Sequence, residues 1–157
     1  MLEKTNVMRI IEQKKLPYVS HYYGDTDAVS GVDVAAAMGE DPEKVFKTLV
    51  CTGKTGNHYV FVIPVKEELD LKKAAKAVGE KSMEMLKSKD LLPLTGYIHG
   101  GCSPIGMKKK FPTYIEETAV LFDEIAVSAG IRGAQVILNP EDLKAYTEAE
   151  YASLTIE

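Results

Sequence analysis

The sequence predicts one α+β domain over residues 1–157, with a mixed, mainly antiparallel sheet and helices packed around it. Three observations predict this fold class. The length of 157 residues suits one domain, and a content of 45% hydrophobic and 27% charged residues suits a single core with a polar surface. Segments typical of strands outnumber segments typical of crossover helices. Short turns join several of these strands, which favours antiparallel pairing over a doubly wound fold.

Capping patterns predict where helices begin. Thr5 or Asn6 can cap a helix over residues 6–15, and Asp70 can cap an amphipathic helix over residues 71–78. Further helix starts are predicted at a capping-box pattern over residues 30–33, at Asp41-Pro42-Glu43 and at Asn139-Pro140-Glu141-Asp142. A single turn of helix is predicted near residues 89–92. We expect these helices to surround the sheet.

Branched and aromatic side chains predict the strands. Residues 45–51 and 58–65 form the most definite pair, because the turn over residues 52–57 contains two glycines that suit a hairpin. The other predicted strands are residues 18–23, 82–85, 113–116, 124–128 and 134–138. A glycine-rich segment over residues 95–106 has no propensity for regular structure.

Composition excludes several classes of protein. No apolar stretch approaches the roughly 20 residues that a membrane span needs, and the N-terminus lacks the apolar core of a secretory signal, so we expect a cytoplasmic protein with no membrane partner. Two cysteines without a C-x-x-C pair and three histidines give no metal-ligand spacing, so no metal is predicted, and nothing indicates a cofactor. The net charge of −4 argues against binding nucleic acid over a large surface and leaves room for a local basic patch.

Lys47 is the first candidate functional residue. Alternation along the strand over residues 45–51 places it on the same face as Leu49 and Cys51, where a cation is unusual. One interpretation is a lysine at the rim of a pocket, where it binds a carbonyl, a phosphate or a ribose. The other is an edge strand whose lysine extends to solvent.

The second candidate feature is the glycine-rich loop Gly100-Gly-Cys-Ser-Pro-Ile-Gly106. Its irregular backbone can direct unpaired N–H groups at a carbonyl or an anion, although a plain tight turn is the alternative. A phosphate-binding P-loop is excluded because Met107 occupies the lysine position of that motif. His99 and Cys102 could form a base and a thiol nucleophile, but the strand geometry at His99 and the two intervening glycines disfavour this pairing.

Two further features place charge near this loop. Lys108, Lys109 and Lys110 form the one concentrated basic patch, which is either a solvated turn or part of a binding surface. The segment Val127-Ser-Ala-Gly-Ile-Arg-Gly133 places a hydroxyl and a guanidinium on a turn between two strands, where they could line the same pocket.

Six segments together carry a resemblance to a known family. They are Lys4-Thr5-Asn6, Val45-Phe-Lys-Thr-Leu49, Leu69-Asp-Leu-Lys-Lys73, Thr95-Gly-Tyr-Ile98, the glycine-rich loop with Lys108-Lys109, and Val127-Ser-Ala-Gly-Ile-Arg-Gly133. With these segments in order between Lys4 and Leu143, the chain resembles the bacterial YbaK-type Cys-tRNA(Pro) deacylases, the YbaK/EbsC family. That family is related to the editing domain of bacterial prolyl-tRNA synthetases.

The resemblance implies a fold, an activity and a mechanism. The fold is an editing domain with a curved, barrel-like sheet, and the activity is trans-editing, the removal of cysteine from mischarged Cys-tRNA(Pro), with Cys-tRNA(Cys) as a further substrate. The thiol of the substrate is expected to cleave its own ester, so that no protein nucleophile and no cofactor are needed. Backbone N–H groups between Gly101 and Ser103 would stabilise the oxyanion. The implied catalytic residues are Lys47, Gly100, Gly101, Cys102 and Ser103.

The resemblance also implies contacts with the substrate. Tyr23 is expected beside the terminal adenosine, although Tyr22 is an alternative, and Ser30 and Gln135 stand where some relatives have an aromatic residue and an acid. Residues 108–110 are expected to contact phosphates of the tRNA acceptor end, and prolyl-tRNA synthetase is the implied protein partner. The implied substrate-binding residues are Tyr23, Ser30, Pro104, Ser128, Gly130, Arg132 and Gln135.

Three rival functions stay open on the sequence alone. Another editing specificity, such as alanine, would keep the scaffold and the loop and change the pocket. A non-catalytic module that binds tRNA or a synthetase would tolerate loss of Lys47. A cysteine-dependent hydrolase would need Cys102 as its nucleophile.

Overall fold

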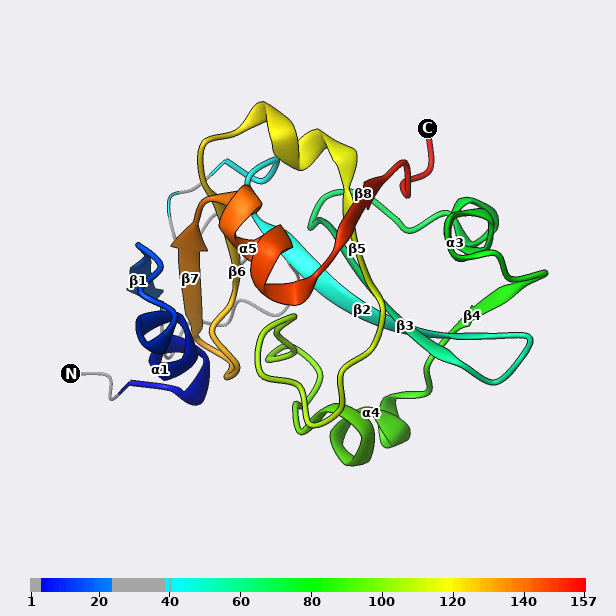
Figure 1. Cartoon of the computed structure of the whole chain (residues 1–157), viewed down its shortest axis with the longest axis horizontal. Helices are drawn as coiled ribbons and strands as arrows, with labels where there is room; N and C mark the ends of the chain where they lie inside the picture. The colour runs from blue at the N-terminus through cyan, green and yellow to red at the C-terminus, as the bar shows by residue number, and fades with distance from the viewer. Residues whose placement is uncertain (1–3, 24–38, 40) are drawn as a thin grey trace.

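The strands lie in two sheets that pack against each other. The computed structural model describes residues 4–23, 39 and 41–157, and Figure 1 shows β6 and β7 on one side of this part of the chain and β2, β3 and β5 on the other. A three-stranded sheet has the order β1-β7-β6, which are Val19–Tyr22, Ala134–Leu138 and Ile125–Ser128. A five-stranded sheet has the order β4-β2-β3-β5-β8, which are Met83–Met85, Phe46–Gly53, His58–Pro64, Thr113–Glu116 and Glu150–Ala152.

Most of the strand pairing is antiparallel, and only β3–β5 and β5–β8 pair in parallel within the described ranges. A parallel bridge between Val45 and Ala126 joins the two sheets, and the N–H of Ala126 donates to the carbonyl of Lys44 at 2.9 Å. The predicted mixed, mainly antiparallel architecture is therefore confirmed, as two joined sheets. The described strands do not close into a barrel.

Local capping patterns account for three of the helices. Side-chain oxygens of Thr5, Asp70 and Asn139 accept backbone N–H groups at the starts of α1, α3 and α5, which span Asn6–Gln13, Leu71–Val78 and Pro140–Thr147. The helix α4, Ser88–Thr95, is longer than the single turn that the sequence predicted. A 3₁₀ helix, η1, spans Glu117–Leu121 and was not predicted.

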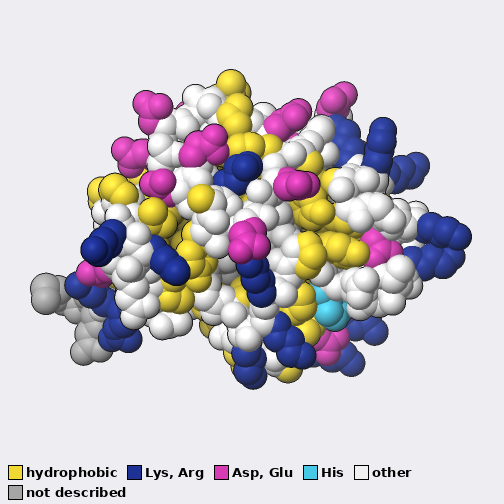
Figure 2. Space-filling view, in the orientation of Figure 1, with side chains coloured by type: hydrophobic (Ala, Val, Ile, Leu, Met, Phe, Trp, Pro, Cys, Tyr) yellow, Lys and Arg dark blue, Asp and Glu magenta, His cyan; other side chains and the backbone are white. Residues whose placement is uncertain are grey.

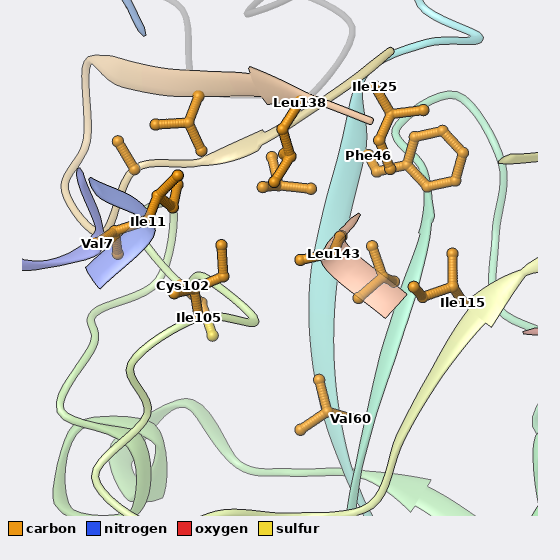
Figure 3. Packing of buried hydrophobic residues seen from close by; sticks show 14 of the residues in the cluster. Val7, Ile11, Phe46, Val60, Cys102, Ile105, Ile115, Ile125, Leu138 and Leu143 are labelled. Atoms are coloured by element: carbon orange, nitrogen blue, oxygen red, sulfur yellow. The ribbon is translucent and has the colours of Figure 1, made fainter. Parts of the chain in front are cut away.

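The main hydrophobic core lies between the two sheets (Figure 3). Phe46 and Val60 of the five-stranded sheet and Ile125 and Leu138 of the three-stranded sheet are each at most 2% exposed. Burial of such a side chain contributes about 1.5–3 kcal/mol to folding. The glycine-rich loop and the helices α1 and α5 complete this core with Cys102, Ile105, Val7, Ile11 and Leu143. The loop is thus anchored by its own buried side chains.

The helix α3 covers the opposite face of the five-stranded sheet, where Ala74 packs with Cys51 and Phe61. Alternation along β2 therefore sends Val50 into the main core and Cys51 toward α3. Lys47 lies four residues before Cys51 in the same strand, so the two side chains point to the same face. The Lys47 side chain consequently points away from the main core.

One predicted helix and one strand that was not predicted separate the sequence analysis from the structure. Asp41-Pro42-Glu43 does not begin a helix, because residues 41–44 form a turn in which Asp41 accepts from the N–H groups of Glu43 and Lys44, each at 2.9 Å. The bridge at Val45 takes the chain into the sheet directly after this turn. The short strand β8 was missed. The predicted helix start at residues 30–33 lies outside the described residues.

Candidate active site

A polar face forms where the two sheets meet. The bridge between Val45 and Ala126 aligns β2 with β6, so Lys47 and Ser128, each two residues further on, point to the same side. Ser128 is the cross-strand neighbour of Gln135, which adds Gln135 to that side. The structure therefore brings three predicted site residues, Lys47, Ser128 and Gln135, onto one face, which we call the polar face.

Tyr23 borders the polar face. Its N–H donates to the carbonyl of Gly133 at 2.8 Å, and its side chain packs against the small cluster of Val45, Val65 and Ala126. Tyr22 is 53% exposed, and as the preceding residue its side chain points to the opposite face of the sheet. Of these two tyrosines, Tyr23 is the one next to the polar face. Ser30 lies outside the described residues.

Lys47 is half-buried at the edge of this face. Its Nζ donates to the carbonyl oxygen of Val65 at 3.4 Å, a long hydrogen bond. Desolvation lowers the pKa of Lys47, while the nearby carboxylates of Glu68 and Glu67 oppose this shift. Although β2 lies inside the five-stranded sheet, its pairing with β4 covers only Cys51–Gly53, so both interpretations of Lys47, a lysine at the rim of a pocket and a lysine on a strand edge, stay open. With one weak hydrogen bond among the described residues, the ammonium retains donors for a ligand.

Gln135 presents an acceptor without a partner. Its side chain is 6% exposed, and its Oε1 has no hydrogen-bond partner among the residues that the structure describes. Its neighbours across the sheet are Ser128 and His21. Ser128 Oγ accepts from the N–H of Gly130 at 3.1 Å, and its hydroxyl can still donate. Since buried acceptors are seldom unpaired, the Gln135 oxygen is a candidate contact for a donor on a ligand.

The glycine-rich loop packs against the turn between β6 and β7. Arg132 Nε donates to the carbonyl of His99 at 2.8 Å. Gly100 has φ +87°, and a Cβ at Gly101 would lie 3.2 Å from backbone atoms of Ile131 and Arg132. Glycine is therefore favoured by backbone conformation at the first position and by close packing at the second. This contact fixes the loop beside the Ser128 end of the polar face.

The loop contains backbone donors that can face a ligand. The N–H of Gly101 donates to the carbonyl of Ile98 at 2.9 Å, so this donor is already occupied. The N–H groups of Cys102 and Ser103 have no protein acceptor within the described part of the chain. The Ser103 hydroxyl is buried and accepts from the N–H of Ile105 at 3.2 Å, which braces the loop. Two adjacent free N–H groups are the donors that an oxyanion needs.

Cys102 is not arranged as a nucleophile. Its side chain is 8% exposed and belongs to the main core, and burial raises the pKa of its thiol to about 12. His99 is exposed and uses its backbone carbonyl to bind Arg132. The structure therefore contradicts a thiolate at Cys102 activated by His99.

Tyr97 is a residue of the loop environment that the sequence interpretation missed. Its hydroxyl donates to the carbonyl of Ile105, and its ring lies so close to Gly130 that a Cβ there would be 3.2 Å from Cε1. Burial raises the pKa of this phenol to about 12. Tyr97 thus links the loop to the β6–β7 turn. The segment Thr95-Gly-Tyr-Ile98, which carries part of the family resemblance, was the signal for it in the sequence.

The predicted basic residues lie elsewhere, around a groove of about 640 Å³ between the end of α1, residues 104–113 and α5. Lys109 and Lys110 line this groove, and Lys110 forms an ion pair with Glu148 at 2.8 Å. Lys108 is exposed nearby. Pro104, in the glycine-rich loop, is buried and lines the groove. The predicted site residues therefore fall into two regions, the polar face with the loop beside it and the groove.

The described ranges contain no helix that is both long and apolar enough to cross a membrane. They also contain no group of three or more His, Cys, Asp or Glu side chains that could hold a metal ion.

Known proteins are similar to this chain over most of its length. The sequence model of the aminoacyl-tRNA editing domain matches residues 26–146. A protein of Enterococcus faecalis with the provisional name Cys-tRNA(Pro)/Cys-tRNA(Cys) deacylase EbsC is 49% identical over 154 residues, which cover 98% of this chain and 94% of that protein. A proline–tRNA ligase of Pelobacter propionicus is 30% identical over 83 residues, 53% of this chain and 14% of the ligase. A crystal structure described as a candidate trans-editing enzyme for prolyl-tRNA synthetase has a TM-score of 0.83 and 27% identity, covering 96% of this chain and 95% of that one.

Proposed function

Because this chain belongs to the family of aminoacyl-tRNA editing domains, we propose that it is a trans-editing deacylase that removes cysteine from mischarged Cys-tRNA(Pro). The relative from E. faecalis, 49% identical, is named for Cys-tRNA(Pro) and Cys-tRNA(Cys), which supports cysteine as the amino acid and adds Cys-tRNA(Cys) as a second substrate. The structural observation that carries the proposal is the polar face beside a loop in which the N–H groups of Cys102 and Ser103 have no acceptor among the described residues.

The loop holds the reacting carbonyl in this proposal. The ester carbonyl oxygen lies against the N–H groups of Cys102 and Ser103, which stabilise the negative charge that develops on it. Removal of one such donor in other enzymes slows catalysis by about 10²–10³-fold. Gly100 and Gly101 serve by allowing the backbone to adopt this conformation, and Arg132 holds the loop against the β6–β7 turn.

The substrate supplies the nucleophile. The cysteine sulfur attacks the carbonyl carbon of its own ester, the bond from that carbon to the ribose oxygen breaks, and the thiol proton passes to the ribose oxygen. The products are deacylated tRNA and a cyclic thioester, which water opens to free cysteine. A buried Cys102 with a raised thiol pKa agrees with a protein that provides no thiolate of its own.

Side chains of the polar face orient the substrate. The Lys47 ammonium binds the ribose or the phosphate of the terminal adenosine, and Tyr23 lies beside that nucleoside. The unpaired Gln135 oxygen accepts from the α-amino group of the amino acid, with Ser128 as its neighbour. Orientation of this kind accounts for a large share of the rate of an intramolecular attack.

The nucleic acid and a protein partner complete the proposal. Lys108, Lys109 and Lys110 contact phosphates of the tRNA acceptor end. Prolyl-tRNA synthetase is the proposed partner, supported by the partial similarity to a proline–tRNA ligase and by the structural similarity to a candidate trans-editing enzyme for that synthetase. Such a partner would supply selectivity for tRNA(Pro) to a protein with few phosphate contacts.

The test is release of amino acid from cysteinyl-, alanyl- and prolyl-tRNA(Pro). We expect rapid loss of cysteine alone, and loss of this activity in Lys47→Ala and Lys47→Met. Lys54→Ala is the matched control, because Lys54 is an exposed lysine on the turn after the same strand. Circular dichroism of each variant confirms that the fold is intact.

Each other outcome identifies a rival function. Release of alanine would keep the site and change its specificity, and release of none of the three would indicate a binding module. Full activity of both Lys47 variants would remove the role given to Lys47. Seryl-tRNA(Pro) should survive, because a hydroxyl is a much weaker nucleophile than a thiolate, and its rapid hydrolysis would contradict the attack by the substrate thiol.

A further inference from the structure

The groove beside α5 takes no part in the chemistry proposed above. Its volume of about 640 Å³ lies in the range of pockets that bind organic ligands. Three segments form its walls: the end of α1, residues 104–113 and α5. Pro104 and Gly106 of the glycine-rich loop line the groove, so the groove borders that loop. A ligand in the groove would lie next to the loop without contacting Lys47.

Three apolar side chains, two of them aromatic, form one wall of the groove. Phe111, Tyr146 and Met107 line it, and each is half-buried against the main core. The Phe111 ring is held edge-to-face against His58, with ring centroids 5.7 Å apart. Partly exposed aromatic rings of fixed orientation are the surfaces on which unstacked nucleobases bind. Asp142, also in the lining, provides an acceptor for the amino group of a base.

Lysines surround this apolar wall. Lys14 and Lys109 line the groove, and neither forms an ion pair with another described residue, whereas Glu148 neutralises Lys110. Figure 2 shows the same face: acidic side chains gather above α5, and most lysine and arginine side chains lie below it and along the right edge. Three lysines and two acids, Asp142 and Glu148, line the groove, so its formal charge is +1 in a chain of net charge −4, and this local excess of positive charge favours phosphate.

We propose that the groove binds an unpaired nucleotide of the substrate RNA next to its aminoacylated end. The base packs against Phe111 and Tyr146, and the phosphate binds at Lys14 and Lys109. This inference rests on the proposed function, because that function brings the 3′ end of a tRNA to the loop. It adds a base-binding surface, built from three segments of the chain, to the phosphate contacts that the lysine motif predicted.

The experiment measures equilibrium binding of a short fluorescent RNA with the single-stranded 3′ end of tRNA(Pro), at several salt concentrations, and of a blunt duplex of the same sequence. Tyr146→Ala should raise the Kd of the single strand about tenfold, the loss expected when one base no longer stacks, and Tyr146→Phe should preserve the affinity. Lys109→Gln should reduce the slope of log Kd against log salt by about 0.7. Lys54→Gln, the same change on an exposed turn outside the groove, should alter neither quantity.

Two results would overturn the inference. They are an unchanged Kd for the single strand in both Tyr146→Ala and Lys109→Gln, or equal losses for single strand and duplex. Lys109 is exposed, so its variant tests the groove even if Tyr146→Ala fails to fold. Deacylation by the wild type is measured separately. Groove-dependent RNA binding without deacylation would refute the proposed function alone, and deacylation without it would refute this inference alone.

Discussion

Arg132 donates from Nε to the backbone carbonyl of His99 at 2.8 Å, and this hydrogen bond ties the β6–β7 turn to the glycine-rich loop. Both residues are exposed, so the bond adds little to global stability. It holds the backbone next to Gly100 against this turn, close in the chain to the N–H groups of Cys102 and Ser103, which have no acceptor among the described residues. The geometry of the loop thus depends on a side chain from a distant hairpin.

Replacement of Arg132 should therefore affect catalysis more than stability. Arg132→Ala should lower kcat for Cys-tRNA(Pro) deacylation about tenfold, because small displacements of reacting groups are costly in rate. Its free energy of unfolding should change by less than about 1 kcal/mol. Single-turnover kinetics and urea unfolding measure the two effects. Arg9→Ala, at an exposed position of α1, is the control, and a large stability loss with normal kinetics in Arg132→Ala would contradict the positioning role.

Gly130 and Gly56 form a matched pair for testing loop packing. Both have a positive φ, +97° and +90°, but a Cβ at Gly130 would lie 3.0 Å from Val7 Cγ2, whereas a Cβ at Gly56 meets nothing within 4 Å. Each change to alanine carries a conformational cost of about 1–2 kcal/mol. Gly130→Ala should lose about 1–3 kcal/mol more from the steric clash, as measured by urea unfolding. Equal losses of unfolding free energy in the two variants would show that the side chains around Gly130 can move aside at little cost.

Lys47 should titrate below an ordinary lysine, because burial disfavours its charged form. NMR of the Lys47 side chain across alkaline pH measures this pKa, and Glu68→Gln should lower it further by removing a favourable carboxylate. Since the folded protein releases this proton before the unfolded chain does, the contribution of Lys47 to stability rises with pH between its lowered pKa and the ordinary lysine value. The stability difference between wild type and Lys47→Met should follow this rise. The rate of deacylation should fall over the same pH range, because Lys47 loses its charge there. A Lys47 pKa above that of an ordinary lysine would refute the burial argument.

The two cysteines should be inert in the folded protein. Burial raises the pKa of the Cys51 and Cys102 thiols to about 12 in each case. A thiol-specific chromogenic reagent at neutral pH should react with neither thiol until denaturant unfolds the chain. Cys102→Ala should retain deacylation within a few-fold, because Cys102 is proposed to act through its N–H alone. Rapid labelling of Cys102 with concurrent loss of activity would restore the thiol-nucleophile hypothesis.

Glu116 should be important for stability. It is 3% exposed, and its two carboxylate oxygens accept from the N–H groups of Leu154 and Thr118, each at 2.9 Å. Glu116→Ala leaves the buried Leu154 N–H without an acceptor, and we expect a loss of about 1–3 kcal/mol in urea unfolding. Glu117→Ala, at the exposed neighbouring position, is the control and should change little. Similar values for the two variants would mean that water replaces the carboxylate.

Elements governed by neighbouring residues could be predicted from the sequence. Residues next to α3 in the sequence determine both of its ends: Asp70 caps its start, and Gly79, with φ +81°, follows its last residue. The β2–β3 hairpin likewise depends on the glycines of its own turn, including Gly56. These interactions join residues only a few positions apart, so sequence patterns contain them.

Predictions failed where a distant strand decided the conformation. Asp41-Pro42-Glu43 has the composition of a helix start, but the bridge between Val45 and Ala126 draws the chain into the sheet after one turn. The strand β8 was missed because its short segment becomes a strand by pairing in parallel with β5. Neither the turn at residues 41–44 nor the strand β8 can be predicted from the neighbouring residues in the sequence alone.

Some features of the candidate site could likewise be predicted from the sequence, and others depend on the tertiary structure. The sequence by itself determined the chemistry: a lysine inside a strand, a glycine-rich loop, a basic motif, and through them the family of the chain. Only the tertiary structure decided that Lys47 shares a face with Ser128 and Gln135, that Tyr97 links the loop to the β6–β7 turn, and that a groove borders that loop. Residue types and short spacings set local conformation and reactivity, whereas side chains from separate strands and loops meet only when burial of the common core brings those elements together.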